Sequence, residues 1–218
     1  MRTPLPLTNF HIKLLAALLM VIDHTGLVLF DNSATMRFIG RFSFPLFAWL
    51  LVQGEAHTGR FGRYALRLLL FGLISQPFYH LTFGTTGLEL NILFTLLLGL
   101  LCLRGARRYP QSLWAIWLVG AAIAQLLNVN YGAYGIGAIA LIRYYRRDGR
   151  RDSLWWLAWI GLHLLSFYEY GPSQFPAMAS PVFFELANQQ PGAKARWFYW
   201  FYPVHLLAIW LIERYIWP

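Results

Sequence analysis

An acid and an imidazole stand side by side, as Asp23 and His24, inside the apolar stretch at residues 13–30. Ionisable groups are costly in an apolar surrounding, so their presence there usually has a functional reason. His24 is a candidate general base, because an imidazole takes up a proton near neutral pH. Neighbouring residues of a helix point about 100° apart, so we expect Asp23 to pair with Arg41 of the next apolar stretch. An ion pair that only fixes helix packing explains Asp23 and Arg41 equally well.

Lys13 and His24 lie eleven positions apart, which puts both on the same side of a helix. The rise between them is about 16 Å, so Lys13 lies at the edge of a membrane when His24 lies near its middle. A hydrogen bond to another helix is the alternative role for His24.

Polar residues recur with helical spacing in two further stretches. Asn91 and Thr95 predict a polar stripe within one helix, which fits either an interhelical hydrogen bond or a role in substrate binding. Tyr202 and His205 form a similar stripe near the end of the chain, where a purely aromatic face is the alternative. Apart from Ser166, no polar residue lies at helical spacing from His163, so we expect it to be a packed core histidine.

The elements that must position these residues are predicted from composition. The chain has 218 residues, of which 58% are hydrophobic and only 12% charged, and this predicts an all-α, polytopic transmembrane bundle. A bilayer needs roughly 17 to 25 apolar residues per helix, so about nine spans in one integral membrane domain, 1–218, are expected. The eighth stretch contains Glu185 and is flanked by prolines, so it is either a span or a re-entrant segment. The predicted spans are 13–30, 38–53, 64–83, 90–103, 113–128, 132–145, 154–168, 175–188 and 197–217.

The distribution of charge predicts the orientation. A cytoplasmic N-terminus puts most of the 18 basic residues on the cytoplasmic side and leaves Arg37, Arg41 and Arg214 outside. The net charge of +9 suits anionic membrane lipid or a phosphate-rich ligand. Nucleic acid is not an expected partner, because the basic residues lie in short loops, and no metal is expected. With Cys102 as its single cysteine, the chain forms no intramolecular disulfide.

Five segments together resemble the TraX family of bacterial membrane proteins: "MVIDHTG", "RFIGRFSFPLFAWLLVQG", "YALRLLLFGLISQPF", "NILFTLLLGL" and "WFYWFYPVHLL". The resemblance is most specific over 20–54 and 202–206. It implies a multi-pass protein of the bacterial inner membrane, related to transmembrane acyltransferases such as heparan-α-glucosaminide N-acetyltransferase. The family is associated with N-terminal acetylation of conjugative pilin subunits. The acceptor is then a peptide, a pilin or a glycan.

By this resemblance the catalytic residues are His24, Asp23, Arg41, Asn91 and His205. The related acyltransferase type-three proteins carry an arginine and an essential histidine, separated by ten residues, in their first helix. The matching pair here is Lys13 and His24, so a lysine replaces the arginine. Acetyl-CoA is the implied acyl donor. His24 would deprotonate the acceptor, and Asn91 would stabilise the oxyanion.

The donor site is expected on the cytoplasmic face. The phosphates of acetyl-CoA would bind near four arginines, and the pantetheine arm would run along the stripe from Lys13 to His24. The four arginines are Arg60, Arg63, Arg67 and Arg104.

Two other classes of function compete with this interpretation. In a small proton-coupled membrane transporter, Asp23, His24 and His205 would form a proton relay, but no inverted repeat supports it. A non-enzymatic assembly partner of a pilus or secretion system would leave the buried ionisable residues largely unexplained.

Overall fold

The computed structural model describes residues 6–85, 87–146, 153–195 and 197–216. Within these ranges the backbone forms helices and, apart from two isolated bridges, no β-structure. The all-α class predicted from the sequence is therefore confirmed. Some basic residues assigned to the cytoplasmic side lie outside the described residues, namely Arg2, Arg147, Arg150, Arg151 and Arg196.

The chain divides into two compact units, and each is built from segments that are far apart in the sequence. The first unit comprises Met1–Leu50 and Tyr145–Phe198, and the second comprises Leu51–Tyr144 and Tyr199–Pro218. One integral domain over 1–218 stays a prediction.

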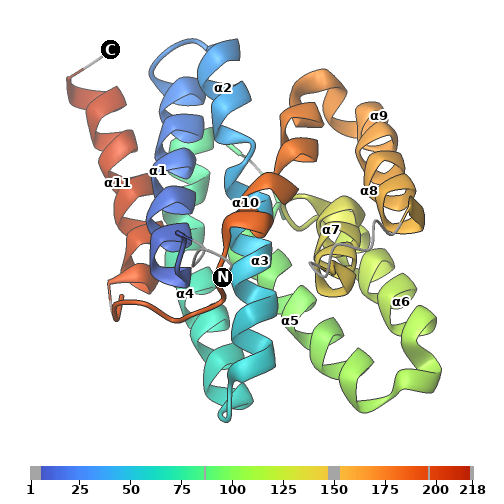
Figure 1. Ribbon diagram of the computed structural model, residues 1–218. Coiled ribbons are helices and arrows are strands. Elements are labelled where there is room, and N and C mark those ends of the chain that lie inside the picture. Colours follow the sequence, from blue (N-terminus) through green and yellow to red (C-terminus); the bar gives the residue numbers. More distant parts are fainter. Residues whose placement is uncertain (1–5, 86, 147–152, 196, 217–218) are drawn as a thin grey trace. The chain divides into compact units, whose positions relative to one another are not determined.

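The first unit is organised around helix α1, which lies along α2 (Figure 1). Thr8 caps α1: its hydroxyl accepts the His11 N–H at 3.3 Å, and the His11 ring accepts the Thr8 N–H at 3.2 Å. The close approach of α1 and α2 depends on Gly40, because a Cβ atom there would collide with Asp23. The helices of this unit are α1 (Asn9–Val28), α2 (Ala34–Gly40), the first part of α3 (Ser43–His57), α8 (Ser153–Leu165), α9 (Phe167–Tyr170), the 3₁₀ segment Gly171–Ala179 and α10 (Pro181–Leu186).

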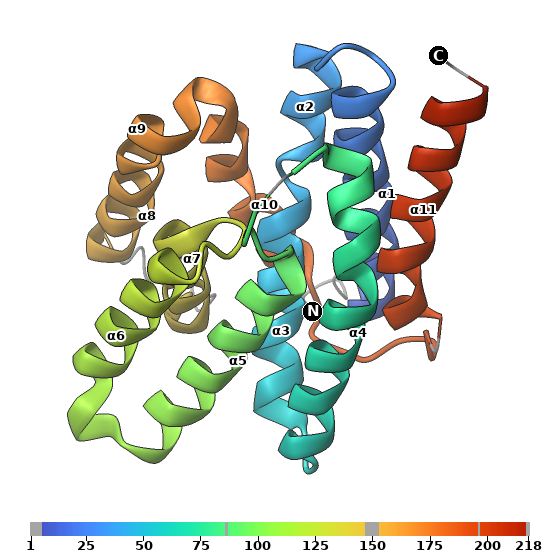
Figure 2. The same cartoon turned by 180° about the vertical axis from the view of Figure 1, so that it is seen from behind.

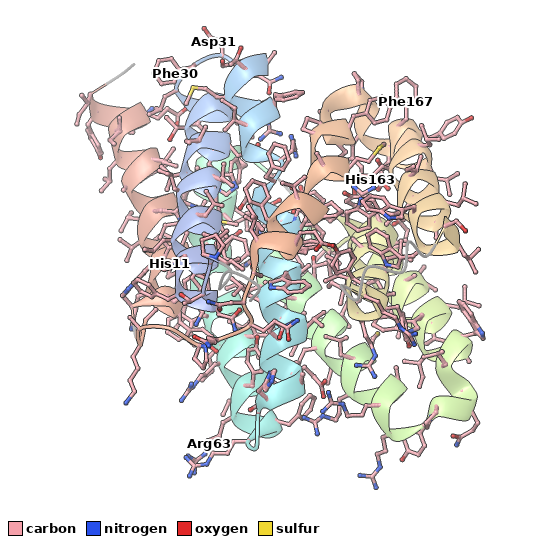
Figure 3. The ribbon with its side chains drawn as sticks, viewed as in Figure 1. His11, Phe30, Asp31, Arg63, His163 and Phe167 are labelled. Atoms are coloured by element: carbon pink, nitrogen blue, oxygen red, sulfur yellow. The ribbon has the colours of Figure 1, made fainter. Side chains whose placement is uncertain are left out.

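Aromatic side chains form the core of the first unit. Trp49 stacks on Phe184 with ring centroids 4.8 Å apart, and Trp155 stacks on Trp159 at 5.3 Å. His163 is fully buried beside Trp159 and donates from Nδ1 to the Trp159 carbonyl at 2.8 Å (Figure 3). The prediction of a packed core histidine is confirmed.

The second unit is organised around α5, which packs against α4, α6 and α7 (Figure 2). Helices α4 and α5 form a hairpin, so the start of α4 and the end of α5 lie at the same end of this unit. Besides the last residues of α3, the unit contains α4 (Phe61–Phe83), α5 (Ile92–Arg108), the 3₁₀ turn Pro110–Ser112, α6 (Leu113–Leu126), α7 (Gly132–Tyr144) and α11 (Phe198–Tyr215).

Most predicted spans correspond to one helix, and three differ, of which 154–168 contains a turn at Ser166 between α8 and α9. The segment 175–188 is not a regular helix of spanning length, because Pro176 and Pro181 interrupt it and lack the N–H that a helix interior needs. The segment 38–53 contains a turn at Arg41 and Phe42, between α2 and α3.

Two stretches of the described chain are long and apolar enough to cross a membrane, namely Asn9–Val28 and Ala34–His57. This agrees with a membrane protein. Nine spans and a cytoplasmic N-terminus stay predictions.

Candidate functional site

Asp23 lies between two arginines in the first unit. Arg37 Nη1 lies 2.6 Å from Asp23 Oδ2, and Arg41 Nε lies 3.7 Å from Oδ1. Asp23 and Arg41 are each only 7% exposed. The expected pair of Asp23 with Arg41 is therefore present, but the shorter contact comes from Arg37, which the sequence analysis placed in the outer loop. Arg37 and Arg41 are four residues apart, and this spacing is the signal that would have identified both as partners.

His24 and Lys13 share the single helix α1, as the sequence predicts. Both side chains are half-buried, in contrast to the buried His163 and His205. The Lys13 ammonium lies over the Phe198 ring at 5.6 Å from its centroid. Since α1 is unbroken from Asn9 to Val28, the rise of about 16 Å between Lys13 and His24 holds.

Asn91 precedes helix α5 and caps it, so it is not part of a stripe inside the helix. Its Oδ1 accepts the Leu93 N–H at 3.0 Å, and its Nδ2 donates to the Gly72 carbonyl at 2.8 Å and to Gln76 Oε1 at 2.7 Å. An amide nitrogen carries two hydrogens, and both are used. Asn91 is completely buried. Asn91 thus connects α4 to the start of α5 through both of its amide hydrogens, and the expected oxyanion role stays a prediction.

His205 lies in α11 and is 7% exposed. Its Nδ1 donates to the Phe201 carbonyl at 2.9 Å, and its ring stacks on Phe201 with centroids 4.6 Å apart. A neutral imidazole that donates from Nδ1 carries its lone pair on Nε2. His205 therefore carries its hydrogen on Nδ1, and this tautomer allows Nε2 to accept a proton.

Three of the four arginines predicted to bind the donor belong to the beginning of α4. Arg60, Arg63 and Arg67 are exposed, and Arg63 lies at the free end of the helix (Figure 3). The Arg67 guanidinium lies over the Tyr199 ring at 5.7 Å.

The fourth arginine, Arg104, is engaged by a residue that the sequence analysis missed. Glu55 of α3 is 1% exposed, and its carboxylate lies 2.9 Å from Arg104 Nε and 3.0 Å from Arg107 Nη2. The Arg104 guanidinium also lies 4.6 Å from the centroid of the Phe61 ring. The three-residue spacing of the arginines on one helix face is the signal that fits a shared anion.

The predicted site residues thus fall into two sets. The first unit contains Lys13, Asp23, His24 and Arg41, and the structure brings Asp23 together with Arg41. The second unit contains Asn91 and His205 with the four arginines predicted to bind the donor.

Comparison with known proteins identifies the family. The family model described as TraX protein matches residues 9–213. The chain is 32% identical to a probable fimbrial assembly protein FimC, serogroup H1, of Dichelobacter nodosus, over 92% of this chain and 93% of that protein. It is also 32% identical to a protein TraX of Escherichia coli, over 67% of this chain and 60% of that protein. No solved structure matches the chain. The match over nearly the whole length shows that this chain belongs to the TraX family.

Proposed function

We propose that this protein is a membrane-embedded acetyltransferase. It moves the acetyl group of cytoplasmic acetyl-CoA to an amine or hydroxyl acceptor at the outer side of the bacterial inner membrane. The observation that carries the proposal is His24, a half-buried histidine next to the doubly paired Asp23 on the apolar helix α1. A charge pair that only joined α1 to α2 would not need an accessible imidazole beside it.

Exposed apolar side chains support the membrane location. On α6, Trp114 is 77% exposed, Leu118 is 70% exposed and Leu126 is 84% exposed. Large apolar side chains are also exposed on α4 and α8, including Leu73 and Leu157. Large apolar side chains with such exposure are unfavourable in water and favourable against lipid acyl chains.

The donor site is assigned to the basic end of the second unit. Acetyl-CoA carries several phosphate charges, and the exposed Arg60, Arg63 and Arg67 can donate charge-assisted hydrogen bonds to them. Arg104 adds positive charge at the end of α5, although Glu55 already holds its guanidinium.

The chemistry assigned to His24 is general base catalysis. The acceptor nitrogen or oxygen attacks the thioester carbonyl carbon and loses a proton to His24. The new C–N or C–O bond forms, the C–S bond breaks, and the CoA sulfur leaves and is protonated. Asp23, held by Arg37 and Arg41, positions the turn of α1 that carries His24. Asn91 positions the start of α5, and His205 is a second histidine able to accept a proton at Nε2.

The names of the relatives suggest the acceptor class. One relative is described as a probable fimbrial assembly protein, and others are described as TraX. We assign to this chain an acceptor among the subunits of a pilus or fimbria, with the amino terminus of such a subunit as the reacting group.

The test measures binding and slow hydrolysis of acetyl-CoA by the purified protein in detergent. His24→Gln is compared with His57→Gln, which changes a histidine at the exposed end of α3. We expect hydrolysis to fall at least 100-fold in the His24 variant and to be unchanged in the His57 variant. If the His24 variant hydrolysed acetyl-CoA at a rate within threefold of the wild-type rate, His24 would not be the general base.

The donor site is tested in the same experiment. Arg63→Ala is compared with Arg108→Ala, which removes the same charge from the exposed last turn of α5. We expect only the Arg63 change to raise the Kd for acetyl-CoA, by about tenfold for one lost charge-assisted contact. No binding of millimolar acetyl-CoA to the wild-type protein would refute the acetyltransferase.

A further inference from the structure

Glu89 is a carboxylate that is held rigidly in the loop between α4 and α5. The Tyr79 hydroxyl donates to Glu89 Oε1 at 2.6 Å, and Asn130 Nδ2 donates to the Tyr79 oxygen at 3.1 Å. The backbone carbonyl of Glu89 accepts from Gln76 Nε2 at 2.6 Å. Both the backbone and the side chain of Glu89 are therefore fixed before any ligand binds.

Among the residues that the structure describes, Glu89 has no ion-pair partner. Asp23 and Glu55 are each paired with two arginines, whereas no lysine, arginine or histidine in the described part of the chain forms an ion pair with Glu89. Glu89 is half-buried. An anion that is partly removed from water and has no cationic partner attracts a positively charged ligand.

The surroundings of Glu89 connect it to the candidate chemistry of the second unit. The last turn of α4, which leads into the loop of Glu89, contacts α11, because the Thr82 hydroxyl donates to the Leu206 carbonyl at 3.1 Å. Tyr202 packs against His205 with ring centroids 5.3 Å apart. The loop of Glu89 thus follows the end of a helix that contacts α11, which carries the second histidine.

The loop that contains Glu89 is also on the side where an acceptor is expected. Arg60 and Arg63 precede or begin α4 and are predicted to be cytoplasmic, so the loop after α4 lies at the outer end of that helix. An acceptor from outside the cytoplasm reaches this end of the unit first.

We propose that Glu89, oriented by Tyr79 and Asn130, binds the protonated amino group of the acceptor and makes the enzyme specific for amines over alcohols. This inference rests on the proposed acetyltransfer. In the bound state the ammonium group donates to the Glu89 carboxylate. It releases one proton to water before its nitrogen attacks the thioester, and the attacking nitrogen loses the second proton to the general base. A hydroxyl group in its place gains no ionic attraction.

The experiment measures binding of two peptides to the full-length protein in detergent by saturation-transfer NMR. Both peptides end in an uncharged carboxamide. One probe is alanyl-glycyl-glycine amide, and the other is lactyl-glycyl-glycine amide, which has a hydroxyl in place of the amino group. The test variant is Glu89→Gln. The matched control is Glu185→Gln, because Glu185 also accepts from a tyrosine hydroxyl, that of Tyr145, and is exposed.

We expect the wild type to bind the amine at least tenfold more tightly than the alcohol. Glu89→Gln should abolish this preference, and Glu185→Gln should keep it. The inference would be overturned if all three proteins preferred the amine over the alcohol by the same factor. It would also be overturned if the wild type did not bind the amine.

Acetyl-CoA binding and thermal unfolding, measured on the same samples, separate the two proposals. Intact acetyl-CoA binding without an amine preference refutes the role of Glu89 and leaves the acetyltransferase. A Glu89-dependent amine preference without acetyl-CoA binding supports the cation site and refutes the acetyltransferase.

Discussion

Two buried carboxylates of this protein, Asp23 and Glu55, are each held by two arginines. In both cases the arginines are one helical turn apart, so their guanidinium groups converge on one acceptor. A carboxylate that is shielded from water needs such compensation, because its own desolvation is costly. At the residue scale, these arrangements explain why charged residues persist in apolar helices.

Glu55→Gln should destabilise the second unit. The change leaves Arg104 and Arg107 beside a neutral amide, and we expect a loss of about 1–3 kcal/mol in unfolding free energy. The loss stays below that of a fully buried pair, because the Arg104 and Arg107 side chains are 34% and 41% exposed and regain water. Thermal unfolding in detergent measures the effect. Glu213→Gln, at a partly exposed position of α11, is the control and should change stability little.

At the element scale, the approach of α1 to α2 positions Asp23. Gly40 lies directly against Asp23, and Gly26 lies against Met36, so neither glycine has room for a side chain unless the helices separate. The short Arg37 contact depends on this approach.

Gly40→Ala should separate α1 from α2 and weaken the contact between Arg37 and Asp23. Overpacking of this kind costs about 1–3 kcal/mol, and we also expect hydrolysis of acetyl-CoA to decrease. The matched control is Gly62→Ala, because a Cβ atom at Gly62 in α4 meets no other atom within 4 Å. Gly62→Ala should be neutral or stabilising by up to about 1 kcal/mol. Denaturant midpoints that shift equally in both variants would contradict the packing role of Gly40.

At the scale of the whole molecule, exposed apolar helix faces and the distribution of basic residues predict a membrane protein with a cytoplasmic N-terminus. Helix α4 is the clearest place to examine this orientation. Its first turn follows Arg60 and contains Arg63, and its other end leads into the loop that holds Glu89.

Single-cysteine labelling tests the orientation of α4. In a Cys102→Ser background, Gly59→Cys and Gly87→Cys place one thiol before and one after the helix, at two positions with open space. A membrane-impermeant maleimide should label the Gly87 variant in spheroplasts and the Gly59 variant only in inverted vesicles. Labelling from the opposite sides would reverse the predicted topology, and labelling of both variants in spheroplasts would mean that α4 does not cross the membrane.

The sequence by itself determined the helical class, most helix positions and the residues worth testing on α1. These features depend on local composition and on the helical repeat, which are read along the chain. The segment 175–188 was predicted less well, because its prolines break a stretch that is otherwise apolar.

Only the tertiary structure decided which polar groups meet. Arg37 is the closer partner of Asp23, Glu55 holds Arg104, and Asn91 uses both its amide hydrogens in structural bonds. The spacing of two arginines by one helical turn indicates a shared anion, but it does not say which carboxylate that is, because a buried polar group is satisfied by neighbours that are distant in the chain. For the same reason, only the tertiary structure shows that no lysine, arginine or histidine among the described residues forms an ion pair with Glu89.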